Sequence, residues 1–513
     1  MRRQFSVVVL TVLFHALPAV SQQQSLVITN AQLADGTGAP LRKANLRITG
    51  SRITKIGNFK PTKSDQVLDA KGLVLAPGFI DIHNHSTQGL ETDPLAETQI
   101  AQGITSLVTG ADGDSPWPIA PWLEARQKNP ASVNVAVIAG HATIRELVMG
   151  KDFRRTATPE EIEKMATLTT HAMHEGAIGL SSGLEYYVAS YSNTEEVVAM
   201  AAAAAKAGGF YMTHIRDEGN KSFEALKEEI EIGRRAHIPV EHSHIKLGTV
   251  DVWHKAPQYI AIINDARKHG VDFLADCYPY EAWASGLKVI MPDKQYENPV
   301  SVEKAIADNG GPETVTITEF KPNPAYVGHT LGELGKLYGI SPVEMYIRMI
   351  REGDAAGTEA GIIGHSIIEE DVKAFYQQPW VMVASDGGIN SDHPRGAGTF
   401  PRVLGLYVRE KKWLTLPEAV RKMTSLPAKR LGWKDRGTLK VGNFADLVLF
   451  NPDTVIDHST FEKPLELPTG IEKVFVNGQL TWDSGHATGA KPGSVLTRGG
   501  VEFRLPDTRA GSF

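Results

Sequence analysis

The sequence contains a single cysteine, Cys277, among its 513 residues. An internal disulfide and a structural zinc site built from cysteines are therefore both excluded. Basic residues are not in excess, because 53 Lys and Arg stand against 59 Asp and Glu, for a formal net charge of −6. A nucleic-acid partner would favour a basic surface, which this composition does not indicate. Any bound metal must be held by carboxylates and by some of the 17 histidines.

Long apolar runs are also scarce, and the clearest one lies near the start of the chain. Arg2 and Arg3 precede the apolar run 5–14, and the small residues of 19–21 follow it. This pattern predicts a signal peptide over 1–21, cleaved before Gln22, because the run is too short to span a bilayer. An uncleaved anchor and a disordered extension are the alternatives. With no disulfide available, we expect export to a bacterial periplasm and no other membrane contact.

The centre of the chain alternates between predicted strands and helices. Helices are expected over 194–207 and 220–236, among others. Repeated strand–helix units predict an α/β fold, a (β/α)8 TIM-type barrel over 77–430. A long connection before the last strand predicts an insertion at about 288–375. The predicted strands are 78–85, 104–110, 134–141, 177–183, 210–216, 238–246, 271–280 and 380–388.

Both ends of the expected mature chain are rich in short apolar runs separated by turn signals. Asp35-Gly36 and Gly50-Ser51 break the N-terminal part, and the C-terminal part has similar runs before a glycine-rich tail. We expect the two parts, 22–76 and 431–513, to pair in space as one small β domain.

Histidines and one acid are predicted to lie where strands end. His83 and His85 are two residues apart on one strand, so both imidazoles can face the same side. His214, His244 and Asp386 end three other predicted strands. Barrel enzymes place their sites at this face, so these residues predict a metal site. His141 ends a further strand and is either a substrate or orienting contact or a packing residue. His242 is expected on the same side of its strand as His244 but one layer deeper, as a residue that packs or orients a ligand.

Several longer motifs resemble one family. The segment 76–85, Ala-Pro-Gly-Phe-Ile-Asp-Ile-His-Asn-His, looks like the opening motif of the amidohydrolase superfamily. Other segments resemble its D-aminoacylase branch, the N-acyl-D-amino-acid deacylases, across nearly the whole chain: 181–186, 213–218, 243–246, 278–280, 385–387, 393–402 and 421–428. The resemblance implies a barrel with a small β-sandwich from both termini, zinc as cofactor, and hydrolysis of a small-molecule N-acyl-D-amino acid.

One position departs from the pattern of this branch. Its members usually have a cysteine metal ligand after the second barrel strand, where this sequence reads Gly110-Ala111-Asp112-Gly113. Asp112 is our first candidate for the replacement ligand and Glu185 the second, since a carboxylate can bridge two ions. Either acid could instead be a surface residue. We expect one or two divalent ions, with zinc first. Other divalent metals are alternatives, because the oxygen ligand Asp112 favours less thiophilic ions.

The expected chemistry follows from these residues. A metal-bound hydroxide would attack the amide carbonyl, and Asp386 would act as general base and then protonate the leaving amine. Lys246, two residues after His244, is placed to bind a substrate carboxylate. By resemblance, Tyr280 and Arg395 would bind it as well.

Other reactions remain open at this stage. The same site could hydrolyse a dipeptide, a lactone or a cyclic amide, and a non-catalytic binding protein is a further alternative. Gly179-Leu180-Ser181-Ser182-Gly183 also matches the G-x-S-x-G nucleophile elbow of serine hydrolases, which predicts Ser181 as a nucleophile.

Overall fold

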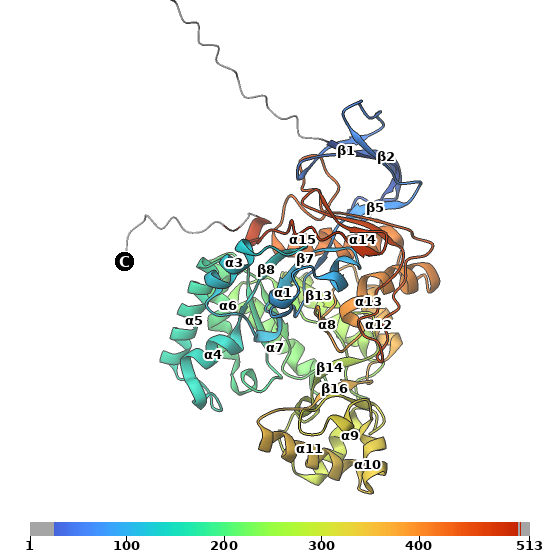
Figure 1. The fold of residues 1–513 in the computed structure, drawn as a ribbon. Coiled ribbons are helices and arrows are strands. Elements are labelled where there is room, and N and C mark those ends of the chain that lie inside the picture. The colour runs from blue at the N-terminus through green and yellow to red at the C-terminus, as the bar shows by residue number, and fades with distance from the viewer. Residues whose placement is uncertain (1–24, 501–502, 504–513) are drawn as a thin grey trace, which may run out of the picture.

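The computed structural model describes residues 25–500 and residue 503 (Figure 1). The expected signal peptide lies outside the described residues. No helix in the described part of the chain is long and apolar enough to cross a membrane.

Two parallel sheets form the centre of the molecule. One has the order β6-β7-β8, and the other the order β17-β13-β12-β11-β10-β9. The predicted strands all overlap these elements, so the α/β class is confirmed. The bounds are β6 Phe79–Asp81, β7 Ile104–Thr109, β8 Asn134–Val137, β9 Ala139–Gly140, β10 Leu180–Gly183, β11 Tyr211–His214, β12 Val240–His242, β13 Phe273–Cys277 and β17 Val381–Val383.

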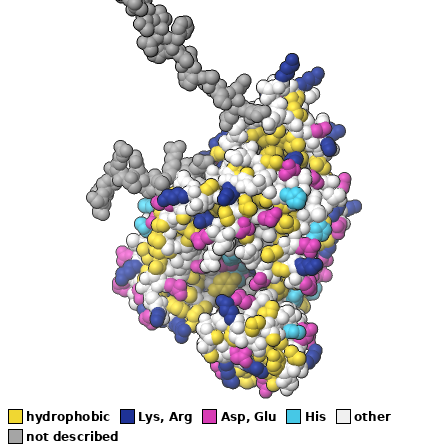
Figure 2. Space-filling model, in the orientation of Figure 1, with side chains coloured by type: hydrophobic (Ala, Val, Ile, Leu, Met, Phe, Trp, Pro, Cys, Tyr) yellow, Lys and Arg dark blue, Asp and Glu magenta, His cyan; other side chains and the backbone are white. Residues whose placement is uncertain are grey.

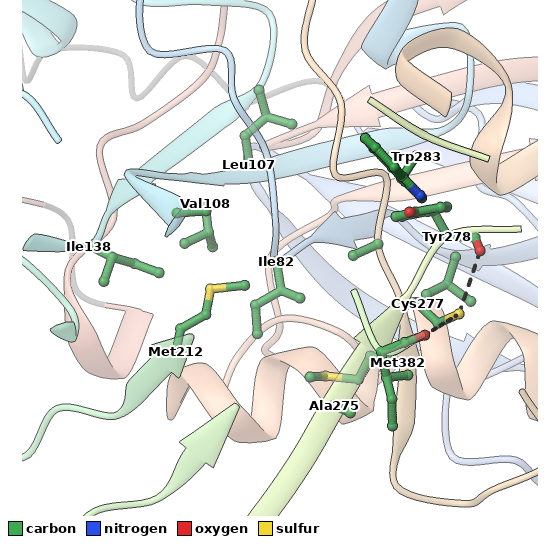
Figure 3. Packing of buried hydrophobic residues seen from close by; sticks show 14 of the residues in the cluster. Ile82, Leu107, Val108, Ile138, Met212, Ala275, Cys277, Tyr278, Trp283 and Met382 are labelled. Carbon is green, nitrogen blue, oxygen red and sulfur yellow. Dashed lines mark hydrogen bonds between the residues drawn. The ribbon is translucent and has the colours of Figure 1, made fainter. Parts of the chain in front are cut away.

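These strands are buried along their whole length. Parallel strands have both faces covered, which explains why their sequences are apolar runs rather than alternating patterns. Figure 3 shows side chains from several strands and from residues directly beside them, among them Ile82, Val108, Ile138 and Met212, packed between the strands. Helices connect the strands: α3 Ile119–Lys128, α4 His141–Met149, α5 Pro159–His174, α6 Thr194–Lys206, α7 Ser222–Ala236, α8 Ala256–Lys268 and α12 Glu369–Tyr376.

Backbone hydrogen bonds join the two parallel sheets at both of their junctions. On one side, the N–H of Ile178, just before β10, donates to the carbonyl of Val137, the last residue of β8, at 2.9 Å. On the other side, the N–H of Asp386 donates to the carbonyl of His83 at 3.0 Å, and the N–H of His85 donates to the carbonyl of Gly387 at 2.7 Å. The loops that follow β6 and β17 are therefore held directly against each other.

Strands from both ends of the chain share a nine-stranded mixed sheet, which brings the blue and the red segments together in Figure 1. Its order is β21-β20-β19-β18-β5-β1-β2-β3, and β4 pairs with β1. A separate apolar cluster that includes Ile28, Leu75 and Phe475 packs on it. The bounds are β1 Ser25–Leu33, β2 Arg42–Thr49, β3 Arg52–Gly57, β4 Gln66–Asp69, β5 Val74–Pro77, β18 Leu447–Phe450, β19 Ile471–Val476, β20 Gln479–Asp483 and β21 His486–Ala487.

The connection between β13 and β17 contains a separate lobe, seen at the bottom of Figure 1. Its three strands pair antiparallel in the order β14-β16-β15. Thr330 and Ser341 each begin a helix with a capping box. The bounds are β14 Trp283–Gly286, α9 Pro299–Asp308, β15 Val315–Glu319, α10 Leu331–Tyr338, α11 Pro342–Ala356 and β16 Gly361–Gly364.

Candidate metal centre

The predicted histidines and Asp386 meet at the carboxyl ends of the parallel strands. His83 and His85 follow β6, His214 is the last residue of β11, His244 follows β12, and Asp386 follows β17. These strands lie side by side and run in one direction, so residues far apart in sequence reach one place. His83, His214, His244 and Asp386 are each almost fully buried.

Asp112 joins this group from a tight turn after β7. It lies in the 3-10 turn η1 (Ala111–Gly113) with φ of 55°, a left-handed conformation that is uncommon for residues other than glycine. The hydroxyl of Ser181 spans the turn, since it donates to the carbonyl of Gly110 at 2.5 Å and accepts from the N–H of Gly113 at 3.0 Å. These bonds hold the Asp112 side chain toward the histidines.

One set of donor atoms forms around His83 and His85. Nε2 of His83 lies 3.2 Å from Oδ1 of Asp386 and 3.5 Å from Oδ1 of Asp112. Nε2 of His85 lies 3.0 Å from Oδ1 of Asp386 and 3.6 Å from Oδ2 of Asp112. Two imidazole nitrogens and two carboxylates thus converge on one small volume.

A second set forms around His214 and His244. Nδ1 of His214 lies 3.1 Å from Nε2 of His244, which is itself 3.5 Å from Oδ2 of Asp112. The two sets therefore meet at Asp112. The ligand atoms of His83, Asp112, His244 and Asp386 all lie within 4.8 Å of one another, and so do those of His214, Glu218 and His244.

Three further carboxylates contact the outer nitrogens of these histidines. Oε2 of Glu185 lies 2.8 Å from Nε2 of His214, and Oε1 of Glu218 lies 3.0 Å from Nδ1 of His244. Oδ1 of Asp276 lies 3.4 Å from Nδ1 of His83, and it also accepts the backbone N–H of His244 at 2.8 Å. Carboxylates in such positions fix ring orientation and raise the basicity of a histidine ligand.

Two of these carboxylates were missed by the sequence analysis. Glu218 comes four residues after His214 in a segment that already resembles the family, and this spacing was a usable signal. Asp276 is a charged residue in the otherwise apolar strand β13, which is a second signal. Glu185 was expected to be a possible metal ligand, but it lies against the nitrogen of His214 that points away from His244.

The cluster contains buried polar atoms without hydrogen-bond partners among the described residues. They are Nδ1 and Nε2 of His83, Oδ1 of Asp112, Oε1 of Glu218 and Oδ2 of Asp276. Unpartnered buried polar atoms are costly and call for an explanation, such as an ion. A set of imidazole nitrogens and carboxylate oxygens is what zinc and related divalent ions bind, so these residues fit a metal.

The charges of the cluster agree with that interpretation. Burial would raise the pKa of Asp112 and of Asp386, but neighbouring positive groups, Arg395 first among them for Asp386, hold both pKa values well below the usual range. Burial would lower the pKa of His83, but nearby carboxylates raise it well above its usual value. Burial lowers the pKa of His214 to about 3. The ionised carboxylates thus require positive charge here, which protonated histidines or a bound cation can supply.

Comparisons with known proteins agree with this geometry. The sequence profile of the amidohydrolase family matches residues 66–482. The chain belongs to the amidohydrolase family.

Its relatives within the amidohydrolases confirm the expected branch. D-aminoacylase of Alcaligenes xylosoxydans xylosoxydans is 36% identical over 503 residues, which cover 93% of this chain and 98% of the relative. N-acyl-D-aspartate deacylase of the same organism is 34% identical over 505 residues, which cover 93% of this chain and 96% of the relative.

Solved amidohydrolase structures have the same fold. A D-aminoacylase structure that concerns a binuclear metal centre superposes with a TM-score of 0.82 at 33% identity. N-acyl-D-glutamate deacylase from Bordetella bronchiseptica, solved with zinc and a phosphonate inhibitor, gives a TM-score of 0.83 at 32% identity. Each match covers 92% of this chain and 99% of the other chain.

Two cations lie beside the donor cluster of this amidohydrolase. Arg395 contacts Oδ2 of Asp386 at 2.6 Å, and Lys246 contacts Oε2 of Glu218 at 2.6 Å. The guanidinium of Arg395 lies 4.8 Å from the ring centre of Tyr278, and the Lys246 ammonium lies 5.9 Å from the same ring. The hydroxyl of Tyr278 is buried without a partner among the described residues. Arg395 and Lys246 are therefore at the site, as expected, and Tyr278 lies between them.

Tyr280 is placed elsewhere. Its hydroxyl donates to the carbonyl of Pro394 at 3.3 Å and lies 3.4 Å from Oδ2 of Asp457. The expectation that Tyr280 lies beside Arg395 and Lys246 at the substrate is wrong for this structure. Tyr280 was assigned by resemblance from the motif Tyr278-Pro279-Tyr280, which follows the end of β13 at Cys277, and within this motif it is the ring of Tyr278 that lies near both cations.

Two other histidines serve packing. Nδ1 of His242 lies 2.6 Å from Oε2 of Glu229 on α7, so His242 points toward the helix layer. It does not share the side of His244, because His244 has a φ of 35° and breaks the extended conformation. Nε2 of His141 lies 2.8 Å from Oε1 of Glu196, and both residues are fully buried. This placement supports the packing alternative for His141.

Ser181 does not fit a serine nucleophile. It is fully buried, and its hydroxyl is occupied by the turn that carries Asp112. A nucleophile elbow requires an exposed hydroxyl next to a histidine base. The serine-hydrolase alternative is therefore wrong for this structure.

Proposed function

We propose that this amidohydrolase is a metal-dependent enzyme that hydrolyses the amide bond of N-acyl-D-amino acids. The observation that carries the proposal is the convergence of four histidines with Asp112 and Asp386, in a chain related over nearly its whole length to deacylases of this kind. The dipeptide, lactone and cyclic-amide alternatives use the same donors, and no specific observation favours them.

The underlying scaffold is proposed to be one closed (β/α)8 barrel. Hydrogen bonds join the two parallel sheets on both sides, between Val137 and Ile178 and between the loops after β6 and β17. Closure explains how donors from the first and last strands, His83 and Asp386, come within 3.2 Å.

The metal would be held by residues at the carboxyl ends of these strands. His83, His85 and Asp386 would hold one ion, His214 and His244 another, and Asp112 would lie between them. Glu185 would orient His214 instead of binding metal, because it faces the outer nitrogen of that ring. A bound divalent ion lowers the pKa of a coordinated water and polarises the amide carbonyl.

Zinc is the first candidate for this ion. The solved N-acyl-D-glutamate deacylase contains zinc, and imidazole and carboxylate ligands suit it. Asp112 stands where the branch usually has a thiolate, and this harder ligand makes cobalt and manganese suitable alternatives.

Asp386 is proposed to move the proton. Its pKa is held low by Arg395 and nearby histidines despite burial, so it is ionised and can accept a proton from the attacking water. The same carboxyl then delivers that proton to the nitrogen of the leaving amine. Arg395 keeps the carboxylate in place through its contact with Oδ2.

Binding of the substrate carboxylate is proposed for the cations at the same end. Arg395 and Lys246 flank Tyr278, whose hydroxyl has no hydrogen-bond partner among the described residues. Charge-assisted hydrogen bonds of this kind are strong and orient the substrate. Tyr278 takes the role that the sequence analysis gave to Tyr280.

A substrate panel tests the proposal. Metal-free protein is prepared with a chelator, reconstituted with zinc, cobalt or manganese, and assayed with matched N-acetyl-D- and N-acetyl-L-amino acids. We expect turnover of the D series only, and only after a metal is restored. Turnover of the L series alone, or only of dipeptides, lactones or cyclic amides, contradicts the substrate assignment. Turnover by metal-free protein contradicts the metal dependence.

A further inference from the structure

Asp386 and Arg395 form an ion pair beside the donor cluster. Figure 2 shows the molecule hollowed where the main body meets the inserted lobe. Both side chains line the cavity that reaches His214 and His244, and Oδ2 of Asp386 lies 2.6 Å from the guanidinium of Arg395. The two residues come from different segments, the loop after β17 and the start of α13 (Arg395–Arg402). Their separation therefore depends on how these two segments are held together.

The two segments touch each other through glycines. Gly387 follows Asp386 and Gly396 follows Arg395, and a Cβ atom added at Gly387 would lie 2.6 Å from the Cα of Gly396. The two backbones are therefore closer than a residue with a Cβ would permit. Asp386 itself has a φ of 49°, a left-handed conformation that persists only where the surroundings support it. A displacement of the first turn of α13 would thus move Arg395 relative to Asp386.

Two buried glutamines bind the first turn of α13. Gln99, on α2 (Glu97–Ile100), and Gln102 are both fully buried. The side-chain amide of each donates to the carbonyl of Gly396 at 2.9 Å, and Oε1 of Gln102 accepts the N–H of Phe400 at 3.3 Å. A carbonyl oxygen has two lone pairs, so it can accept both amides at once. The start of α13 is thus bonded to two side chains of another segment.

Gln99 is also connected to the turn that carries Asp386. Its Oε1 accepts the side-chain amide of Asn84 at 3.1 Å, and this amide donates to Oδ2 of Asp81 at 2.9 Å as well. The carboxylate of Asp81 in turn accepts the N–H of Ser385 at 2.9 Å and the hydroxyl of Ser385 at 2.5 Å. These side chains are all fully buried. A buried network whose hydrogen bonds are made is rigid, so it holds the Asp386 turn and the start of α13 in one arrangement.

We propose that Gln99 and Gln102 are positioning residues, which fix Arg395 relative to Asp386 and to the carboxylate of the substrate. The inference rests on the proposed function and deepens it. Both glutamines act through the backbone of Gly396 and not by contact with the substrate. A misplacement of about 1 Å can slow a reaction by about 10²-fold, so residues outside a site can control its rate.

The variant Gln102→Met tests this proposal, because methionine is of similar length but cannot donate to the carbonyl of Gly396. We expect the KM for N-acetyl-D-methionine and the inhibition constant of its product D-methionine each to rise by about 5–20-fold. The reason is that a displaced Arg395 loses much of a charge-assisted hydrogen bond to the carboxylate. The kcat should fall by about tenfold, because Asp386 loses its fixed partner.

The two constants distinguish positioning from a merely structural role. Neither KM nor an inhibition constant depends on the amount of folded enzyme, so partial unfolding would lower the apparent kcat and leave both constants unchanged. Gln99→Met removes the other donor to Gly396 and should raise the same two constants, which provides the test if Gln102→Met does not fold.

Gln378→Met is the control. It removes the same kind of amide at the amino ends of the strands, where the side chain donates to the carbonyl of Ala374 at 3.0 Å. This variant should keep the wild-type KM and inhibition constant. An equal rise of both constants in Gln378→Met, or wild-type constants in the folded Gln102→Met or Gln99→Met protein, overturns the proposal.

The activity of the wild type keeps the two proposals apart. If the wild type hydrolyses N-acetyl-D-methionine and the two glutamine variants do so with the same KM, the positioning role is overturned and the proposed function stands. If the wild type hydrolyses no N-acyl-D-amino acid with any metal, both are overturned.

Discussion

The buried charged groups at the two ends of the parallel strands differ in how fully they are hydrogen-bonded within the protein. At the amino ends, Arg430 contacts the side chain of Glu241 at 3.2 Å and donates to the carbonyl of Val240 at 2.9 Å. Lys422 donates there to the carbonyls of Gln378 and Val381. At the carboxyl ends, five buried nitrogen and oxygen atoms of the donor cluster have no hydrogen-bond partner among the described residues, whereas in the Arg430–Glu241 pair at the amino ends the one such atom is Oε1 of Glu241.

This difference indicates that the charged groups at the amino ends stabilise the fold, whereas those at the carboxyl ends bind a ligand or an ion. Charges that the protein satisfies internally hold helices and strands together. Charges that it leaves open, at a cost in stability, mark the place where a ligand or ion completes the set. The following predictions test whether the two ends can be altered independently.

The largest effect is expected at the carboxyl ends, from Asp386→Asn. An amide cannot accept the proton from water, so kcat should fall by about 10²–10⁴-fold. The unfolding midpoint should fall as well, because the buried Arg395 loses its charged partner, so kcat is compared at a temperature at which both proteins are folded. Asp114→Asn, an exposed acid nearby, is the control and should keep full activity. Retention of activity by Asp386→Asn contradicts its role in proton transfer.

The next effect is expected at the amino ends, from Arg430→Met. The change leaves the buried Glu241 without its cation, which should lower the free energy of unfolding by about 3–5 kcal/mol in urea denaturation. Arg234→Met removes an exposed arginine paired with Glu231 and should cost less than about 1 kcal/mol. If both variants lose the same free energy of unfolding, the buried pair stabilises the fold no more than the exposed pair does.

A smaller effect is expected from Ser181→Ala, which removes the hydroxyl that spans the Asp112 turn. Metal affinity, measured by competition with a chelator, should weaken by about 10–100-fold. Ser182→Ala is the matched control, because that hydroxyl contacts Tyr211 and Thr213 instead. If Ser181→Ala and Ser182→Ala bind the metal with equal affinity, the Ser181 hydroxyl has no specific effect on metal binding.

The smallest effect concerns pH and Lys422. Burial lowers the pKa of Lys422 to about 7, whereas the unfolded chain keeps this proton up to its ordinary value of 10.5. The unfolded state therefore binds more protons between pH 7 and 10, and the contribution of Lys422 to stability rises with pH.

Between pH 7 and 9, the free energy of unfolding of the wild type should rise relative to that of Lys422→Met by at most about 1.4 kcal/mol per pH unit. Denaturation series of both proteins at each pH measure this difference. Lys429→Met changes an exposed neighbour and should follow the wild-type profile. A constant difference between wild type and Lys422→Met contradicts this titration.

The strands and much of the donor cluster could be predicted from the sequence because the signals are local. Apolar runs bounded by turns gave the strands, and His214 and Asp386 lie where those runs end. The departure at Asp112 was also visible, since one residue differs within a recognisable motif.

The missed features depend on geometry beyond the strand ends. Tyr278 and Tyr280 are both candidates until the end of β13 is known. His242 was assigned to the wrong side because the left-handed φ of His244 breaks the alternation.

The pairing of β5 with β18 sets an order of events during synthesis. Val448 lies opposite Ala76 in this antiparallel pair. The N-terminal strand β5 therefore cannot complete its pairing until the C-terminal strand β18 has been synthesised. Until then β5 has an open edge, which is a site for unwanted association. Completion of the small sheet is thus one of the final steps of maturation, and a chain truncated before β18 would leave that edge permanently exposed.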